Sequence, residues 1–182
     1  GVDYTALPSS VTIPAGQASV ELSLIPIFNG AVSRVATVTI ALDDGSGSAT
    51  ADVALLGPVD SWRYQRLGTY ENAGFAADTA DPDNDGLDNL LEYALNGNPL
   101  KNDASILPTI SRSGGHLVFA YRQNIAATDI TFTVEQSTDL KSWTPVTVEP
   151  QRVSSDGLAD LMEVSVPMQD EKALFLRLKV TR

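Results

Sequence analysis

Short stretches in which apolar and polar residues alternate recur along the chain, and this pattern limits the fold more than any other feature. In the segment 19–27, apolar side chains occupy every second position over most of its length, the period expected for a half-buried β-strand. The segments 36–42 and 49–56 repeat the pattern. Turn sequences separate the three segments, namely Asn29-Gly30 and DDGSGS at 43–48. The first part of the chain is therefore predicted to form a β-sandwich-like region.

The last part of the chain, residues 105–182, shows the same alternation. Four sets of side chains each share one face of a strand: Leu117, Phe119 and Tyr121; Ile130, Phe132 and Val134; Met162, Val164 and Val166; and Leu174, Leu176, Leu178 and Val180. Gly114-Gly115 and Asp156-Gly157 mark turns between strands. This region is predicted to be an antiparallel sheet or a second, small antiparallel β-sandwich.

The stretch between these two regions has a different character. A short helix is predicted after Pro58, with Asp60 as its N-cap and Gly68 as its end. Apolar residues at helical spacing predict a second helix over 87–95, which Gly97 and Pro99 end.

The predicted organisation is thus a mainly β chain with three regions. A partial β-sandwich covers 1–57, a helical linker with an acidic loop covers 58–104, and an antiparallel β domain covers 105–182.

Composition excludes several classes of function. The chain has 23 acidic and 12 basic residues, a net charge of −11 and no basic cluster, so neither nucleic acid nor an anionic membrane is an expected partner. The absence of cysteine excludes disulfides, thiolate catalysis and cysteine-based metal sites. No apolar run approaches the roughly 18 residues of a membrane-spanning helix, so membrane insertion is not expected.

The acidic segment of the middle region has the spacing of a calcium-binding EF-hand loop. Counted from Asp81, its candidate ligands occupy positions 1, 3, 5, 7, 9 and 12. They are Asp81, Asp83, Asp85, Leu87, Asn89 and Glu92. Leu87 offers its backbone carbonyl and turns its side chain to the core, Asn89 acts directly or through a water, and Glu92 closes the shell with both oxygens. Gly86 allows the sharp turn between them.

The alternative interpretation is an acidic turn without an ion, in which Asp88 is simply a favourable charge at a helix N-terminus. A turn does not require Glu92 in register, however, and carboxylates this close repel one another unless a cation is present. Ca²⁺ is therefore the predicted cofactor. Mg²⁺ is less suitable because a small octahedral ion fits a loop with many carboxylates poorly.

The residues that precede the loop, 71–80, contain no adequate helix, so the loop is followed by one helix rather than flanked by two. A single site of this kind predicts a structural role, because calcium sensors generally use paired EF-hands that open to expose a groove. We expect the ion to fix the helix over 87–95 and, through it, the angle between the flanking β regions.

Residues 1–56 resemble the second half of a Calx-β domain, in which a segment like GVDYT leads to a strand, a Pro-Ala-Gly turn and another strand. This resemblance implies a partial, immunoglobulin-like sandwich without its earlier strands. An upstream part of the same polypeptide or a neighbouring subunit would complete it. Calcium-binding members carry acidic residues where this chain has FNGAVSRVA at 28–36, so the resemblance implies no calcium site in this region.

The stretch 81–99 resembles bacterial thrombospondin type-3 repeats and dockerin-like calcium repeats. Residues 60–182 also resemble a C-terminal region of large secreted proteins of Verrucomicrobia and their relatives. The second resemblance implies a secreted or cell-surface location within a longer polypeptide, and it carries no assigned chemistry.

The sequence also contains candidates for catalytic and for sugar-binding residues. His116 is the only histidine, and no nucleophile elbow or glycine-rich phosphate loop accompanies it, so an exposed histidine at a strand end is expected and an enzyme is not. Five aromatic residues could instead form a sugar-stacking platform: Trp62, Tyr64, Tyr70, Tyr121 and Trp143. Core packing of Trp62 and Trp143 is the more common use of such residues.

These observations together predict a non-catalytic, calcium-stabilised module with a structural or adhesive role. It would belong to a larger secreted or cell-surface bacterial protein. The expected setting is an extracellular assembly, with a surface protein as a further partner. The alternative is an ancillary carbohydrate-binding module of a secreted polysaccharide-degrading enzyme, with an extracellular polysaccharide as its ligand.

Overall fold

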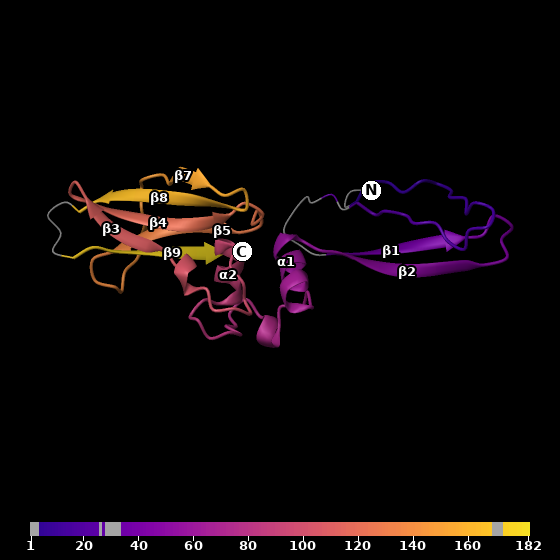
Figure 1. Cartoon of the computed structure of the whole chain (residues 1–182), viewed down its shortest axis with the longest axis horizontal. Helices are drawn as coiled ribbons and strands as arrows, with labels where there is room; N and C mark the ends of the chain where they lie inside the picture. Colours follow the sequence, from indigo (N-terminus) through magenta and orange to yellow (C-terminus); the bar gives the residue numbers. More distant parts are fainter. Residues whose placement is uncertain (1–3, 26, 28–33, 169–172) are drawn as a thin grey trace. The chain divides into compact units, whose positions relative to one another are not determined.

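The computed structural model describes residues 4–25, 27, 34–168 and 173–182 (Figure 1). The chain divides into two compact units, Gly1–Gly57 (unit 1) and Pro58–Arg182 (unit 2). Strands predominate in both units and all of their ladders are antiparallel, as the alternation of apolar residues predicts. None of the described helices has both the length and the apolar character needed to span a bilayer.

The described part of unit 1 contains one β-hairpin. Strands β1 (Arg34–Ala41) and β2 (Ser48–Leu55) pair in register from Arg34 opposite Leu55 to Ala41 opposite Ser48. The turn between them closes through a hydrogen bond of 2.8 Å from the Leu42 N–H to the Gly47 carbonyl. Both strands and this turn lie where the sequence predicts them.

The prediction of a strand over 19–27 is wrong for the described residues of that segment. These are residues 19–25 and 27, and they join no strand ladder. The segment runs along the hairpin as a loop (Figure 1), and its Ile25 carbonyl accepts a hydrogen bond of 2.8 Å from the Thr5 N–H. A period of two places side chains on alternating faces, but a strand also needs a partner edge and a layer to cover its apolar face. The predicted Asn29-Gly30 turn lies outside the described residues.

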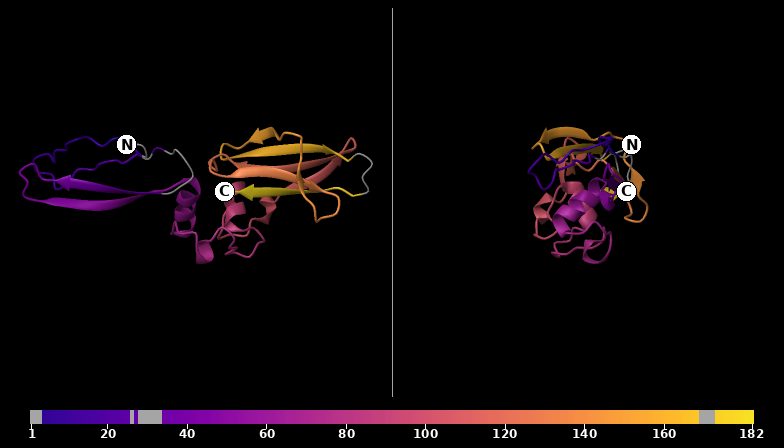
Figure 2. Two further views of the ribbon diagram at one scale, coloured as in Figure 1. Left: turned by 180° about the vertical axis from the view of Figure 1, so that it is seen from behind. Right: turned by 90° about the vertical axis from the view of Figure 1, so that its right-hand side faces the viewer.

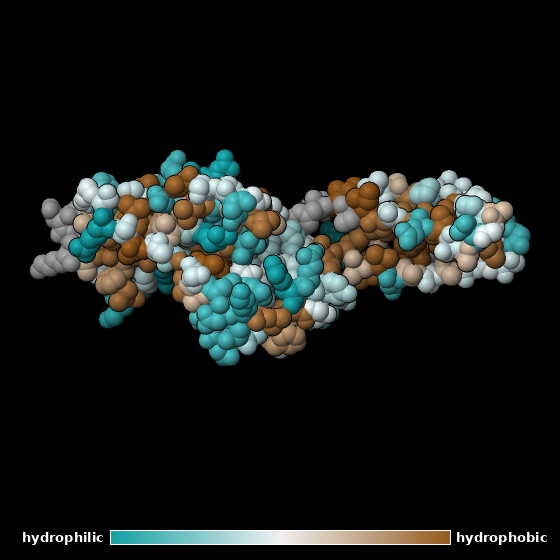
Figure 3. Space-filling model, in the orientation of Figure 1, coloured by the Kyte–Doolittle hydropathy of each residue, from teal (hydrophilic) through white to brown (hydrophobic). Residues whose placement is uncertain are grey.

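Unit 1 buries few of its apolar side chains. Among its described residues, only Ala36 and Leu55 are buried apolar side chains. The large apolar residues that stay exposed are Val11, Ile13, Val20, Leu22, Ile25, Ile27, Val35, Ile40 and Leu42. Figure 3 shows hydrophobic side chains, in brown, at the surface of this unit. The described part of unit 1 is therefore a hairpin and loops with very little core of their own.

Unit 2 contains a β-sandwich of two antiparallel sheets, seen from the front in Figure 1 and from behind in Figure 2. The four-stranded sheet has the order β3 (Thr109–Ser113), β4 (His116–Asn124), β8 (Ala159–Pro167), β7 (Gln151–Ser155). The three-stranded sheet has the order β6 (Thr144–Pro145), β5 (Thr131–Ser137), β9 (Phe175–Thr181).

Side chains from both sheets form the core between them. Its buried members are Phe119, Tyr121, Val134, Val164 and Val166, and Phe132, Val146, Met162, Leu174, Leu176 and Leu178 pack against these. Tyr121 of β4 stacks on Phe132 of β5 with 6.2 Å between ring centroids. Most members of the predicted same-face sets therefore reach this core. Leu117 and Val180 are not among its members, and Ile130 packs elsewhere.

The two α-helices also belong to unit 2. Helix α1 (Pro58–Leu67) begins at Pro58, so Asp60 lies in its first turn and the prediction of Asp60 as N-cap is wrong. Proline fits the first helical position because its missing N–H would be unpaired there anyway. Gly68 ends the helix as predicted, with a left-handed φ of 75°.

Helix α2 (Asn89–Leu95) packs with α1 in a second small core. Val59, Tyr93 and Ala127 form its buried part, and Trp62, Leu90 and Ile130 pack against them. The 3₁₀ turns η1 (Gly74–Ala76) and η2 (Ala104–Ile106) flank the segment that contains α2. Residues 58–104, expected as a linker between β regions, thus form part of the same compact unit as the sandwich.

Candidate metal centre

The acidic loop closes on itself through its own backbone. The Asp81 carboxylate accepts hydrogen bonds from the Asp85 N–H at 3.2 Å and the Gly86 N–H at 2.9 Å. The Asp85 carboxylate in turn accepts from the Leu87 N–H at 2.9 Å. Gly86 adopts a φ of 91°, which a residue without a Cβ reaches at little cost. The loop therefore gathers its first three aspartates around one turn.

Helix α2 starts directly after this turn and carries Glu92 back towards it. Asp88 is the N-cap, and its side chain accepts from the Leu91 N–H at 2.9 Å. The side chain of Leu87 is 1% exposed, which confirms its predicted direction into the core. Glu92 lies one turn further along α2 and is also 1% exposed.

Five carboxylates meet at this point and form what we call the acidic cluster. Oxygens of Asp81, Asp83 and Asp85 lie within 4.8 Å of one another, and so do oxygens of Asp85, Glu92 and Asp103. A Ca²⁺ ion with ligands about 2.4 Å away separates opposite ligands by about 4.8 Å. Each group of three is therefore compact enough to share an ion.

The Glu92 carboxylate is the most informative member of the cluster. Both of its oxygens are buried and accept no hydrogen bond, and the same holds for one oxygen each of Asp83 and Asp103. Burial and then the neighbouring Asp103 carboxylate raise the pKa of Glu92 to about 8.

In the described part of unit 2, no lysine or arginine forms an ion pair with any member of the cluster. Buried charges without a partner are costly. A cation is the group that this set of oxygens lacks, and hard oxygen donors suit Ca²⁺.

The Asn89 side chain has a structural role that the loop spacing does not predict. Its amide nitrogen donates to the carbonyls of Phe75 at 2.9 Å and Ala77 at 2.7 Å, so it ties η1 to the first turn of α2. Its amide oxygen is buried and accepts no hydrogen bond. The side chain thus has an anchored nitrogen and an oxygen that is still available as a donor to a metal.

Asp103 is the member of the cluster that sequence reasoning missed. Its N–H donates to the Asp85 carboxylate at 2.9 Å, and one of its own carboxylate oxygens accepts from the Asn98 N–H at 3.0 Å. It lies beyond the end of α2 and outside the twelve-residue pattern. No periodicity or motif in the sequence links it to the loop, and only the return of the chain after α2 brings it there.

Gly97 makes room for the Glu92 side chain. A Cβ at Gly97 would lie 1.8 Å from a Glu92 carboxylate oxygen, whereas the left-handed residue at the end of α2 is Asn96, with a φ of 59°. The Gly97 N–H donates to the Glu92 carbonyl at 2.7 Å and the Asn96 N–H to the Tyr93 carbonyl, which is the Schellman arrangement. Glycine is therefore required at position 97 because a Cβ would collide with the Glu92 carboxylate, and not because of the backbone φ angle.

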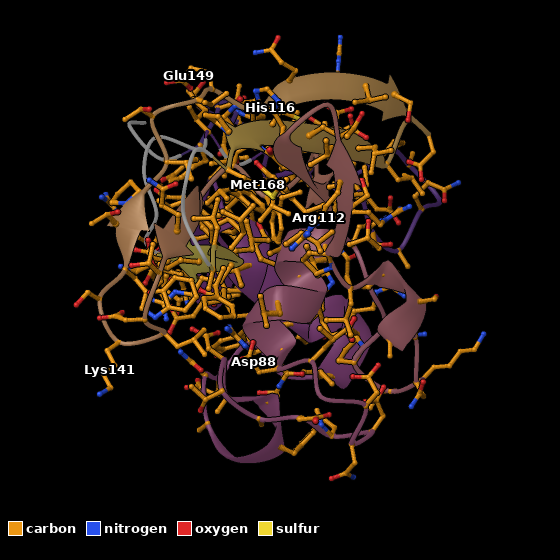
Figure 4. The ribbon with its side chains drawn as sticks, turned by 90° about the vertical axis from the view of Figure 1, so that its left-hand side faces the viewer. Asp88, Arg112, His116, Lys141, Glu149 and Met168 are labelled. Atoms are coloured by element: carbon orange, nitrogen blue, oxygen red, sulfur yellow. The ribbon has the colours of Figure 1, made fainter. Side chains whose placement is uncertain are left out.

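The other candidate residues lie apart from the acidic cluster. His116 begins β4, and its Nδ1 lies 3.0 Å from the Gly114 carbonyl, so its predicted place at a strand end is confirmed. Figure 4 shows His116 in the upper part of the view and Asp88 in the lower part.

The five aromatic residues do not share one surface, because Tyr121 is 3% exposed in the sandwich core and Trp62 packs on Tyr93 with centroids 5.5 Å apart. Trp143 lies beneath the Arg177 guanidinium, which is 4.2 Å from the ring centroid.

Trp143 also lines an open groove of about 460 Å³ on the sandwich. The other lining residues are Ile110, Ser111, Arg112, Leu117, Leu140, Leu174, Phe175 and Leu176. Figure 4 labels Arg112 at this part of unit 2.

Comparison of the chain with protein-family models, with curated proteins and with solved structures gives no match.

Proposed function

We propose that unit 2 is a calcium-stabilised, non-catalytic structural module of a larger secreted or cell-surface bacterial protein. The observation that carries this proposal is the Glu92 carboxylate, which is 1% exposed and has no hydrogen-bond donor on either oxygen, beside the carboxylates of Asp85 and Asp103. A cation between these groups would remove the cost of burying them.

The donor set favours Ca²⁺ over other ions. All side-chain donors in the cluster are oxygens, and the described part of the chain places no histidine there. Ca²⁺ accepts six to eight oxygens in flexible geometry, whereas Mg²⁺ requires six in a near-ideal octahedron. Extracellular modules bind Ca²⁺ with dissociation constants of roughly 10⁻⁴–10⁻³ M, which agrees with the location that the sequence resemblances imply.

A bound ion would act on the contact between α2 and the sandwich. The Tyr93 hydroxyl donates to Asp129 at 2.6 Å, and the Asn124 amide donates to the Tyr93 carbonyl at 2.8 Å. At the end of the helix, Arg122 of β4 donates to the Leu95 carbonyl at 3.3 Å. Because Glu92 lies on this same helix, holding Glu92 to the loop also holds the face of α2 that contacts β4.

A thermal melt with calcium and with chelator tests the proposal. At 1 mM Ca²⁺ and a dissociation constant of about 10⁻⁴ M, binding stabilises by about 1.4 kcal/mol, which raises Tm by about 4–8 °C. The same comparison with 1 mM Mg²⁺ should give a smaller shift. Asp81→Ala and Glu92→Ala should each remove the calcium response. If the Tm of the unchanged chain is the same in calcium and in chelator, a structural ion is contradicted.

For unit 1 we propose that additional β-strands cover its exposed apolar side chains, supplied by an upstream part of the same polypeptide or by a neighbouring subunit. The exposure of Ile40 at 51%, on a hairpin whose strands each have one partner among the described residues, supports this. Ile40→Lys distinguishes the two sources. If a neighbouring subunit covers this face, light scattering detects an oligomer that the variant dissociates, whereas strands from the same polypeptide leave the protein monomeric.

The second candidate function is carbohydrate binding at the Trp143 groove. An aromatic residue beside an open groove of about 460 Å³ is the observation that favours it. Trp143→Ala tests it on a glycan array. Trp62→Ala is unsuitable for this purpose because Trp62 packs against Tyr93 in the second core.

A further inference from the structure

The segment that follows α2 turns back onto the acidic cluster. The Lys101 N–H donates to the Asn98 carbonyl at 3.0 Å, which closes a turn, and the Asn98 N–H donates to Asp103 at 3.0 Å. The Asp103 N–H then donates to Asp85 at 2.9 Å. These three bonds hold the Asp103 side chain within 4.8 Å of oxygens of both Asp85 and Glu92.

One carboxylate oxygen of Asp103 accepts a hydrogen bond within this turn, and the other accepts none. The first accepts a hydrogen bond from the Asn98 N–H at 3.0 Å. The second is buried and accepts no hydrogen bond. The Asp103 carboxylate lies beside that of Glu92, whose two oxygens are also buried and without a described donor. Two carboxylates from separate segments thus meet, and three of their four oxygens accept no hydrogen bond from a described N–H or O–H group.

We propose that Asp103 is a ligand of the same cation that Glu92 holds, so that the ion binds a residue from outside the twelve-residue loop. This inference rests on the proposed calcium site. It explains why a carboxylate is placed against two others, an arrangement that repels at close range unless a cation lies between them. It also explains Gly97, because only a residue without a Cβ leaves Glu92 room to lie against the 97–103 segment.

The consequence is that the ion connects three parts of the chain instead of two. The loop supplies Asp81, Asp83 and Asp85, α2 supplies Glu92, and the segment after α2 supplies Asp103. That last segment leads through η2 into β3, an edge strand of the four-stranded sheet. Calcium binding therefore orders the path from α2 into the sandwich as well as the loop.

Calcium titration of the full-length chain by calorimetry tests the inference with four proteins: the unchanged chain, Asp103→Asn, Glu92→Gln and Asp88→Asn. Asparagine at 103 keeps an oxygen for the Asn98 N–H, so the turn is retained. Asp88→Asn is the matched control: it removes the same charge next to the cluster, belongs to neither group of three, and keeps the N-cap because asparagine caps as well as aspartate.

The expected result is a loss of affinity of at least about tenfold in Asp103→Asn, on the scale known for residues around metal sites. Asp88→Asn should change the affinity by less than about threefold, and Glu92→Gln should lose binding. Amide hydrogen exchange gives a second readout. Calcium should slow exchange at the Asn98 and Asp103 amides in the unchanged chain and in Asp88→Asn, and should not do so in Asp103→Asn.

Two failures can be told apart. If the unchanged chain binds no calcium, the proposed function itself is wrong. The second failure begins with the unchanged chain binding calcium and Glu92→Gln not binding it. If Asp103→Asn then binds calcium as tightly as Asp88→Asn and keeps its calcium-dependent protection from amide exchange, Asp103 only shares a proton with Glu92 and is no ligand. A circular-dichroism spectrum of each variant checks that it is folded.

Discussion

Two acidic segments of unit 2 show opposite ways to accommodate carboxylates. The connection between β7 and β8 contains Asp156, whose carboxylate accepts from the Leu158 N–H at 2.9 Å and the Ala159 N–H at 2.7 Å. The same carboxylate pairs with Arg122 at 3.0 Å. These bonds lower the pKa of Asp156 to about 2, and the backbone hydrogen bonds contribute most to this shift. The backbone of this turn and Arg122 of β4 thus give the Asp156 carboxylate its partners.

In the acidic cluster, by contrast, buried carboxylate oxygens lack hydrogen-bond donors. Burial and Asp103 raise the pKa of Glu92 to about 8, and no described donor reaches either of its oxygens. An acidic residue near a glycine is thus no sign of a metal in itself, since Asp156-Gly157 and Asp81–Gly86 both have that composition. What distinguishes them is whether the backbone satisfies the carboxylates or leaves them facing one another. The predictions below test that difference.

The largest effect is expected from Glu92→Gln. Calcium affinity should fall by about 100-fold or more, because the neutral amide removes a bidentate ligand. In chelator, however, the same variant should melt at or above the temperature of the unchanged chain, since it removes a buried carboxyl group that no described donor reaches. Calorimetric melts with and without calcium measure both effects. A variant that is less stable in chelator would show that Glu92 is already satisfied without an ion.

Gly97→Ala should have the next largest effect. Its Cβ would lie 1.8 Å from a Glu92 oxygen, so the carboxylate must move and calcium affinity should fall by about tenfold or more. Overpacking of this kind costs about 1–3 kcal/mol. Gly47→Ala is the matched control, because its nearest contact would be an ordinary 3.7 Å from Leu42. Urea unfolding with and without calcium separates the two variants, and equal responses would contradict the packing argument.

Asp156→Asn should have a smaller effect that does not depend on calcium. Because folding lowers the pKa of Asp156, its ionised form stabilises the native state above the unfolded-state value of about 3.9. That contribution is lost as the pH falls through about 2. Urea midpoints should therefore be lower for the variant at pH 7 and approach those of the unchanged chain towards pH 2. A difference that is constant across this range would exclude an electrostatic origin.

The smallest effect is expected from Asp88→Asn. Asparagine replaces aspartate at an N-cap at little cost, so the free energy of unfolding should change by less than about 0.5 kcal/mol. The calcium-induced rise in Tm should also be retained, because Asp88 belongs to neither group of carboxylates. Parallel melts measure both quantities. A lost calcium response would mean that total negative charge, rather than the arrangement of the acidic cluster, determines binding.

Much of unit 2 could be read from the sequence because its signals are local. Alternation over 117–121 and 162–166 predicts strands whose apolar faces meet in the core, and the structure places them there. In unit 1 the same alternation over 19–27 does not give a strand in the described residues. The difference is physical: a strand requires a partner edge and a covering layer, and a local pattern reports neither.

The grouping of Asp81, Asp83, Asp85 and Glu92 follows from their spacing in the chain, since a loop and one helical turn are too short to place these residues far apart. Three further features come from the tertiary fold: Asp103 joins the cluster, the Asn89 amide nitrogen anchors η1, and Gly97 leaves room for the Glu92 side chain. Each of these depends on where the chain returns after a helix. That path is set by the packing of α2 against the sandwich, and no spacing along the sequence encodes it.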